Sequence, residues 1–410
     1  MNDLKHKFDA RACTSLMRAN KSKRNQQQGF SLVELMVAMT IGMFILAAVG
    51  LVYMTSKNSF TYANNTVRMG EDASLAIDLL TRDVRMGAFG GCAGTTLARS
   101  AGPDTILYTA DDIIDSPILQ TTKSTPNLFS VTGLTDTFSA PNPFSNRVLS
   151  ADTTILGFNG TDTASSAART LINAPISDLT ISTTAPILFV SGGSDKALQV
   201  SAAPVAGTST LNFSGDPLKW NNDPTLVFRL ISDCKGSEIF RSTSTTTAGV
   251  MTLESPLLNS YSADAIVTPV TSSTYFLAKR KNGSVTAATS SLYRRHFNGV
   301  AATIEELVPN VDAIHFEYGL NTALQVAGPN AGQPTFQTDV YVEANAVADW
   351  SRVVSVRIGF ILVSEETNIT PDADNKIQWI KGEYTPANTT DHRLRRAYST
   401  TVSIRNRMGV

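Results

Sequence analysis

Cysteine, histidine and charged residues are scarce in this chain of 410 residues. Three cysteines are too few for a disulfide-rich scaffold, and the absence of any CxxC pair gives no sign of a zinc site or a dithiol redox motif. Charged residues make up 17% of the chain, below the roughly 25% of an average soluble domain. With 34 basic and 35 acidic residues, the whole chain lacks the basic excess of a dedicated nucleic-acid binder. A hydrophobic content of 42% excludes a chain that is disordered throughout.

The near-neutral total conceals a charge boundary close to the N-terminus. Residues 1–29 hold seven basic and two acidic residues, a net charge of +5, so residues 30–410 carry −6. An uncharged stretch of 22 residues follows, from Leu35 to Ser56. A helix of this length crosses a hydrocarbon core of roughly 30 Å, whereas the apolar region of a cleaved secretory signal has about 7–15 residues. We therefore predict a transmembrane helix with its basic flank in the cytoplasm and the rest of the chain outside.

Glu34 lies at the edge of this apolar stretch, where an unpaired carboxylate costs about 2.5–3.5 kcal/mol at bilayer depth. An interfacial glutamate at a helix start is the simplest interpretation. However, the seven residues from Gly29 to Leu35, Gly-Phe-Ser-Leu-Val-Glu-Leu, resemble the type IV prepilin processing motif. The resemblance implies that a prepilin peptidase cuts after Gly29, that Phe30 becomes the methylated N-terminus, and that Glu34 pairs with the N-terminal amine of a neighbouring subunit during assembly.

The same resemblance makes residues 1–29 a cleaved leader, which is long for that family, with Met17 as an alternative start. Residues 55–86 continue the helix with an amphipathic pattern, in which apolar residues recur every three or four positions: Ala73, Ala76, Ile77, Leu80 and Val84. The glycines at 87, 90 and 91 end the pattern. We predict one helix over 30–86, with 30–54 as transmembrane segment and filament core and the second half packed on a sheet.

Residues 87–410 read as a β-rich globular head. Runs of β-branched and aromatic residues predict strands at 186–190, 225–231, 274–278, 291–297, 313–318, 353–363 and 397–404. Segments 94–180 and 321–348 lack such patterns, and we interpret them as surface loops and irregular insertions; whether 94–180 is a separate subdomain stays open. The expected fold class is α+β and pilin-like: a long N-terminal helix, transmembrane in its first half, packed on an antiparallel-sheet head.

Several short segments of the head resemble one particular family of pilins. Residues 85–92, 231–234, 307–311, 316–318, 356–358 and 394–407 are similar to the PilW family of minor pilins. This implies a protein that helps initiate type IV pilus assembly and sits at or near the pilus tip, supporting twitching motility, adhesion or DNA uptake. Its partners would be the prepilin peptidase, other minor pilins and the major pilin. Its place would be the inner membrane with a periplasmic head, then the cell-surface pilus of a Gram-negative bacterium.

Two other classes of protein stay open. J-type pseudopilins of type II secretion share the helical spine and a β-rich head, and gene neighbours would discriminate them from pilins. A membrane-anchored envelope adhesin or enzyme is the third alternative, and it would not depend on the prepilin peptidase.

Few residues suggest chemistry in the mature chain. Loss of the leader would leave Cys92 and Cys234 as the mature thiols, and in an oxidising envelope we predict a disulfide between them, nominally worth about 4–5 kcal/mol for so long a loop. Two separately buried thiols are the alternative. Asp104, Asp111 and Asp112 share one loop and could hold Ca²⁺, but they lack the full spacing with a glycine and a distal glutamate. Solvated turns explain them equally well.

The remaining polar residues predict no catalytic site. The three histidines of the mature chain, His296, His315 and His392, are isolated in sequence and are interpreted as core or surface residues. We therefore expect no enzyme and no cofactor. Residues 393–407 carry five arginines and no acidic residue. A charged sheet edge is the simplest interpretation, and contact with nucleic acid or with an acidic neighbour is the alternative.

Overall fold

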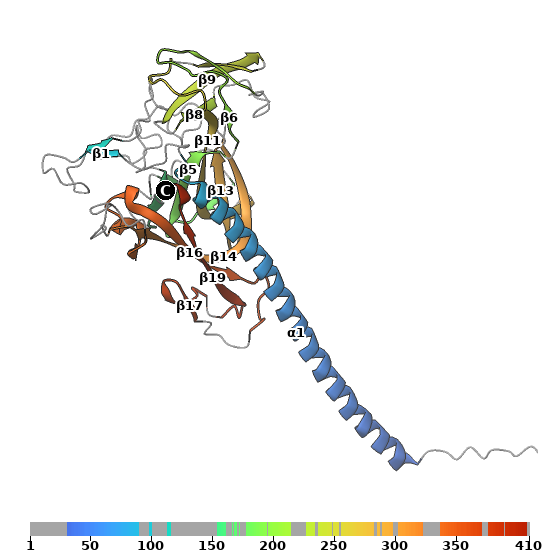
Figure 1. The fold of residues 1–410 in the computed structure, drawn as a ribbon. Helices are drawn as coiled ribbons and strands as arrows, with labels where there is room; N and C mark the ends of the chain where they lie inside the picture. Colours follow the sequence, from blue (N-terminus) through green and yellow to red (C-terminus); the bar gives the residue numbers. More distant parts are fainter. Residues whose placement is uncertain are drawn as a thin grey trace, which may run out of the picture. The chain divides into compact units, whose positions relative to one another are not determined.

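A computed structural model gives the fold of this chain (Figure 1). It describes residues 31–89, the short segments 98–100 and 113–115, and most of 154–407. Within that last range the described residues leave out 161–165, 167, 170–171, 173–177, 195, 215–226, 234–236, 248, 254–255, 283–284, 288, 298–301, 323–336, 371–375 and 389. The chain divides into two compact units, Met1–Ser59 and Phe60–Val410.

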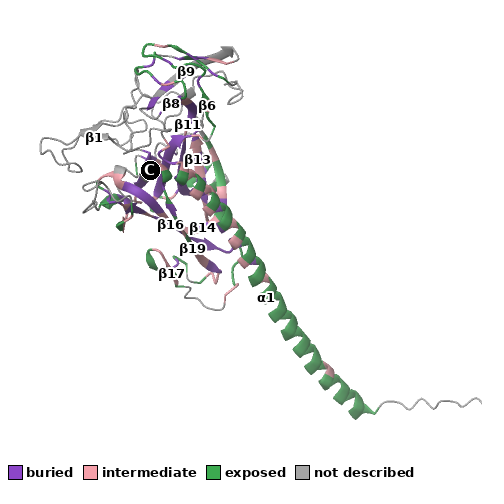
Figure 2. Cartoon of the chain, viewed as in Figure 1, coloured by how far each residue is buried: buried purple, intermediate pink, exposed green. Residues whose placement is uncertain are grey.

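Helix α1, Leu32–Met86, contributes its first half to the first unit and its second half to the other. From Leu32 to Ser59 every residue is exposed except Gly42, which is half-buried (Figure 2). Within the described residues, α1 is the one helix long and apolar enough to cross a membrane. Its N-terminal half therefore has the length and composition of a transmembrane segment.

The head is built from antiparallel strands. The first strands are β1 (Ala98–Ser100), β2 (Ile113–Asp115), β3 (Ile155–Phe158), β4 (Leu179–Ile181), β5 (Ile187–Gly193), β6 (Leu198–Gln199), β7 (Thr210–Asn212), β8 (Val227–Ser232), β9 (Ser237–Thr247) and β10 (Val250–Leu253). There follow β11 (Ile266–Asn282), β12 (Val285–Thr286), β13 (Ser290–Phe297), β14 (Ala302–Leu320), β15 (Val340–Val342), β16 (Val353–Val363), β17 (Ile377–Trp379), β18 (Gly382–Tyr384) and β19 (Arg395–Ser403). Short 3₁₀ turns lie at η2 (Ala344–Ala346), η3 (Trp350–Arg352) and η4 (Arg405–Arg407).

Fifteen of these strands form one sheet with the main order β19-β16-β14-β13-β11-β8-β9-β10-β7. The long strand β11 joins its parts: Ser272–Ala278 pair with β13, Val270–Tyr275 pair with β5, and Ile266–Pro269 pair with β8. The pairs β1–β2 and β17–β18 form two separate hairpins. All pairings among the described strands are antiparallel, both between strands that follow one another, such as β13 and β14, and between distant ones, such as β5 and β11.

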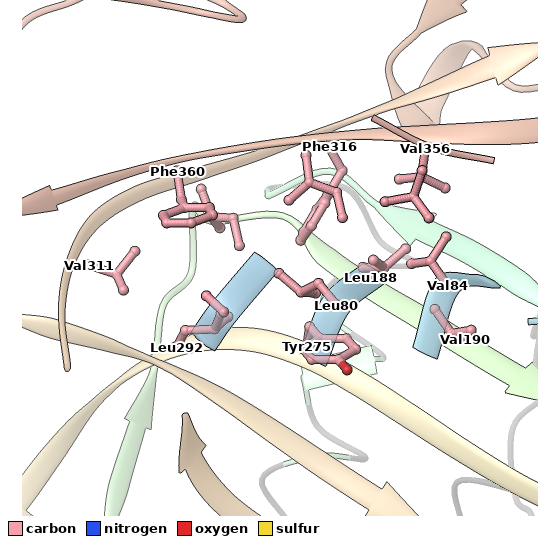
Figure 3. Close-up of a cluster of buried hydrophobic side chains, with 14 of the residues drawn as sticks. Leu80, Val84, Leu188, Val190, Tyr275, Leu292, Val311, Phe316, Val356 and Phe360 are labelled. Carbon is pink, nitrogen blue, oxygen red and sulfur yellow. The ribbon is translucent and has the colours of Figure 1, made fainter. Parts of the chain in front are cut away.

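The second half of α1 lies in the main hydrophobic core of the head. Its buried residues recur every three or four positions: Asn65, Met69, Ala73, Ala76, Leu80 and Val84. The five apolar ones pack in one cluster with residues of β5, β11, β13, β14, β16 and β19. In Figure 3, Leu80 and Val84 lie between Phe316 and Val356 on one side and Tyr275 on the other. The sheet therefore curves around the apolar face of the helix, and both sides of that curve bury it.

The chain leaves α1 by crossing β5 at close range. Ala88 adopts a left-handed backbone (φ 62°), which ends the helix, and its amide donates to the Ser191 carbonyl at 2.9 Å. A Cβ atom at Gly192 would lie 2.6 Å from the Met86 carbonyl oxygen, so only glycine fits there. The Gly193 amide also donates to the Phe89 carbonyl at 2.9 Å. The Gly192–Gly193 pair therefore fixes where the helix exits over the sheet.

The predicted fold class is confirmed: a long N-terminal helix precedes an antiparallel β-rich head. Each of the seven predicted strands coincides with an observed one, from β5 to β19. The interpretation of 94–180 and 321–348 as loops and irregular insertions was partly wrong. Ile155–Phe158 forms the fully buried strand β3, and Val340–Val342 pairs with β14. These short strands form because neighbouring strands of the sheet pair with them, and their own sequences show no alternation of apolar and polar residues that would predict them.

Two leucines on α1 test whether the helix belongs to the core of the head. Leu80 is 0% exposed and Leu75 is 49% exposed. We expect Leu80→Ala to lower the free energy of unfolding of the head by about 2–5 kcal/mol because it opens a cavity in the core. Leu75→Ala should change it by less than about 0.5 kcal/mol. Urea unfolding of the full chain in nanodiscs, followed by tryptophan fluorescence, measures both. Equal effects would contradict the packing described here.

Candidate assembly site

Glu34 stands in the first turn of α1 and is the one charged residue between Phe30 and Lys57. The Ser31 carbonyl accepts the first helical hydrogen bond, from the Leu35 amide at 3.1 Å. A carboxylate in this turn is favoured by the free amides and the dipole of the helix N-terminus. The side chain is exposed, and no ion pair reaches it from the described part of the chain. Glu34 therefore presents a carboxylate on an apolar helix surface, where a cation from another molecule could bind it.

Several predicted site residues lie outside the described residues. Gly29 and Phe30, the predicted cleavage and methylation positions, precede Ser31. Cys92 and Cys234, the predicted disulfide partners, are also outside, as are the calcium candidates Asp104, Asp111 and Asp112. Within the described residues, no group of three or more His, Cys, Asp or Glu side chains is placed to hold a metal ion.

The three histidines are tied to the head by local contacts. His315 is buried on β14, with its Nε2 3.6 Å from Glu343 and 4.0 Å from Glu317. Burial, and then the nearby Lys381 charge, lowers the pKa of His315. His296 Nδ1 lies 3.1 Å from the Ser273 hydroxyl, and burial lowers its pKa as well. His392 Nδ1 lies 3.1 Å from the Thr370 carbonyl. These contacts fit the interpretation of core and surface histidines.

The arginine-rich C-terminal segment is turned largely inward. Arg395 is buried and forms a bidentate ion pair with Asp391, at 2.9 and 2.7 Å, and a contact with Asp312 at 2.8 Å. The pair with Arg395 lowers the pKa of Asp391 below its usual value. Arg393 donates to the Ser364 carbonyl at 3.0 Å. These arginines therefore stabilise the head and are largely withdrawn from any surface that could attract phosphates.

Arg407 and Asn406 together join four parts of the head. Its guanidinium donates to the carbonyls of Trp350 and Val353, the latter at 2.9 Å, and to the Thr154 hydroxyl at 2.6 Å. The adjacent Asn406 amide donates to the Gly87 carbonyl at 3.1 Å. Thus the C-terminal turn η4 binds the end of α1, η3, the start of β16 and the residue preceding β3. Arg396 and Arg405 lie nearer solvent: Arg405 is exposed and Arg396 is half-buried.

Sequence reasoning missed the role of Asp83. The amphipathic pattern placed it away from the apolar face of the helix, yet its side chain is only 15% exposed. It accepts a hydrogen bond from the Tyr275 hydroxyl at 2.6 Å and one from Arg294 at 3.2 Å. Because its partners come from β11 and β13, about 190–210 positions later in the sequence, no local pattern could reveal them.

Two neighbouring arginines test whether the arginines of the C-terminal segment stabilise the head through buried ion pairs. Arg395→Ala leaves Asp391 and Asp312 without their buried cation, so we expect it to lower the free energy of unfolding by about 3–5 kcal/mol. Arg396 reaches the exposed Tyr62 hydroxyl, at 3.4 Å, and has no ion pair within the described residues, so Arg396→Ala should cost less than about 1 kcal/mol. Chemical denaturation of the full chain measures both. A larger loss for Arg396→Ala than for Arg395→Ala would contradict this assignment.

Comparison with known families assigns both ends of the chain. Residues 274–406 match the family model of PilW, type IV pilus-assembly protein W, and residues 24–50 match the model of the prokaryotic N-terminal methylation motif. The first match runs from within β11 to η4, and the second covers the segment around Gly29 and the first third of α1. No curated protein matches the chain. With one long apolar N-terminal helix and an antiparallel head, the chain is therefore similar, over these two segments, to prepilin-type pilins of the PilW family.

Proposed function

We propose that this protein is a minor pilin that helps initiate type IV pilus assembly and sits at or near the pilus tip. The observation that supports it most directly is the coincidence of the N-terminal methylation motif with the exposed apolar segment of α1 from Leu32 to Ser59, in which Glu34 is the one carboxylate. An apolar helix surface of this kind suits a lipid bilayer before assembly and other pilin helices after it. Twitching motility, adhesion or DNA uptake would follow from the filament that it helps to build.

In this proposal the chemistry is done to the protein and not by it. A prepilin peptidase cuts between Gly29 and Phe30 and methylates the new N-terminus. The Glu34 carboxylate then pairs with the N-terminal amine of a neighbouring pilin, which offsets the cost of placing a charge among apolar helices. Before assembly, the +5 leader stays in the cytoplasm and the head lies in the periplasm. There, Cys92 and Cys234 can form a disulfide.

The PilW match favours a pilus over a type II secretion system as the site of action. Contact with nucleic acid has less support than the sequence suggested. The ion pairs of Arg395 and the hydrogen bonds of Arg407 occupy two of the five C-terminal arginines inside the head. We therefore place the protein's main contacts with other pilins.

Mass spectrometry of the mature N-terminus tests the processing step. We expect the protein from a strain with an active prepilin peptidase to begin at a methylated Phe30. In a strain that lacks the peptidase, residues before Gly29 should remain. A mature N-terminus elsewhere, or the same N-terminus in both strains, would overturn the assignment of Gly29 and Phe30.

A substitution at Glu34 tests the assembly step. Glu34→Val removes the carboxylate and keeps the helix apolar, so we expect the protein to be processed and inserted but pilus number to fall at least tenfold. Thr40→Val is a matched control, since the Thr40 hydroxyl bonds only within the helix, to the Val37 carbonyl at 2.9 Å. Counting pili by electron microscopy compares the two variants. Normal piliation in the Glu34→Val strain would count against the assembly role.

A further inference from the structure

The position of α1 along its axis on the sheet depends on the sizes of its apolar side chains, on the backbone contacts at the helix end and on polar side chains. Buried residues recur at nearly constant spacing, as Met69, Ala73, Ala76, Leu80 and Val84. A slide by four residues, roughly 6 Å, would put Ala76 near the place of Leu80 and Leu80 at that of Val84. Such a shift would cost packing, because an alanine would take the place of a leucine, but apolar side chains would still face apolar side chains. A polar contact, which is directional, distinguishes the two positions further.

Asp83, Tyr275 and Arg294 supply that contact. Tyr275 is fully buried and donates its hydroxyl to Asp83 Oδ2 at 2.6 Å, and Arg294 reaches the same oxygen at 3.2 Å. Burial and the Asp83 charge raise the pKa of Tyr275 well above its ordinary value, so the phenol stays protonated and remains a donor. Arg294 is itself held from its other side by the Glu305 carboxylate, with its Nε 2.6 Å from Oε1. Both donors are therefore aimed at one helix position.

We propose that Asp83, Tyr275 and Arg294 form a register lock, which fixes the position of the spine helix on the head along the helix axis. A slide of four residues would bring Leu79 to the place of Asp83. The buried Tyr275 hydroxyl and the Arg294 guanidinium would then lose their acceptor, which is costly for a buried donor. Buried polar contacts that specify one register among several apolar ones are known from helical coiled coils.

The register lock has a mechanical use that rests on the proposed function. Movement of a pilin out of the bilayer would pull on α1 along its axis, and the lock would add a directional contact to the apolar packing that resists such a slide. The lock opposes it at the last turn of the helix, next to the contacts that fix Gly87 and Ala88. The lock itself can be measured on the purified chain, so its test does not depend on whether the protein builds pili.

Distance measurements between the helix and the head test the lock. Spin-labelled non-natural residues at Val67 and Val340, which are 58% and 44% exposed, report on the helix position in the full chain in nanodiscs. A second pair, Leu75 with Val340, senses the same movement from another site. In the unsubstituted chain we expect one distance for each pair. In an Asp83→Asn and Tyr275→Phe double variant we expect a second population, displaced by up to about 6 Å, the rise of four helical residues.

Matched variants separate a loss of register from a loss of the fold. Tyr62→Phe removes another helix-to-head hydrogen bond, the exposed one to Arg396, and should leave both distances unchanged. If the double variant does not fold, the single variants decide, because each keeps the size of its side chain. A folded double variant, or two folded single variants, with the unchanged single distance would overturn the proposal. A displaced population in the Tyr62→Phe control would overturn it as well, because the polar contact at Asp83 would then not be what fixes the helix.

Discussion

The burial of one apolar face of α1 in a curved antiparallel sheet is the interaction on which the rest of the head depends. Leu80 and Val84 contact side chains from both arms of the curve, so the helix fills the space that the sheet would otherwise leave open (Figure 3). The same helix begins as an apolar segment, Leu32 to Ser59, that is exposed among the described residues. One element thus combines an exposed apolar surface with the centre of the head's core.

A chain with few charges uses many of them internally. Asp83 pairs with Arg294, Asp391 and Asp312 hold Arg395, and Arg407 binds backbone carbonyls where its segment meets the end of α1. Glu238, also buried, accepts hydrogen bonds from the amides of Leu258 and Asn259 and fixes their loop. Buried charges require such partners, because an unpaired one would be too costly. Several of the few charged residues, including arginines of the C-terminal segment, are therefore used to hold the head together. Their number and position alone do not indicate a nucleic-acid surface.

The spacing of apolar residues along the sequence predicted the long helix and the long strands, because these elements depend mainly on contacts between residues near one another in sequence. The three- and four-residue spacing of Ala73, Ala76, Leu80 and Val84 gave the buried face of α1, and runs such as Val353–Val363 gave the long strands. Sequence reasoning missed the short strand β3 and the ion pairs of Asp83 with Arg294 and of Arg395 with Asp312, whose partners lie far apart in sequence. In the candidate site, it singled out Glu34, because a lone charge beside an apolar stretch is visible without any tertiary contact.

Hydrogen exchange tests most directly the claim that the second half of α1 is part of the head's core. The full chain in nanodiscs would be exchanged in deuterated buffer, and the amides of residues 65–84 compared with those of β14 and β16. We predict that both sets exchange through the same opening of the head, with equal free energies and an equal dependence on urea. Fast, urea-independent exchange along residues 65–84, beside a sheet that stays protected, would contradict the account.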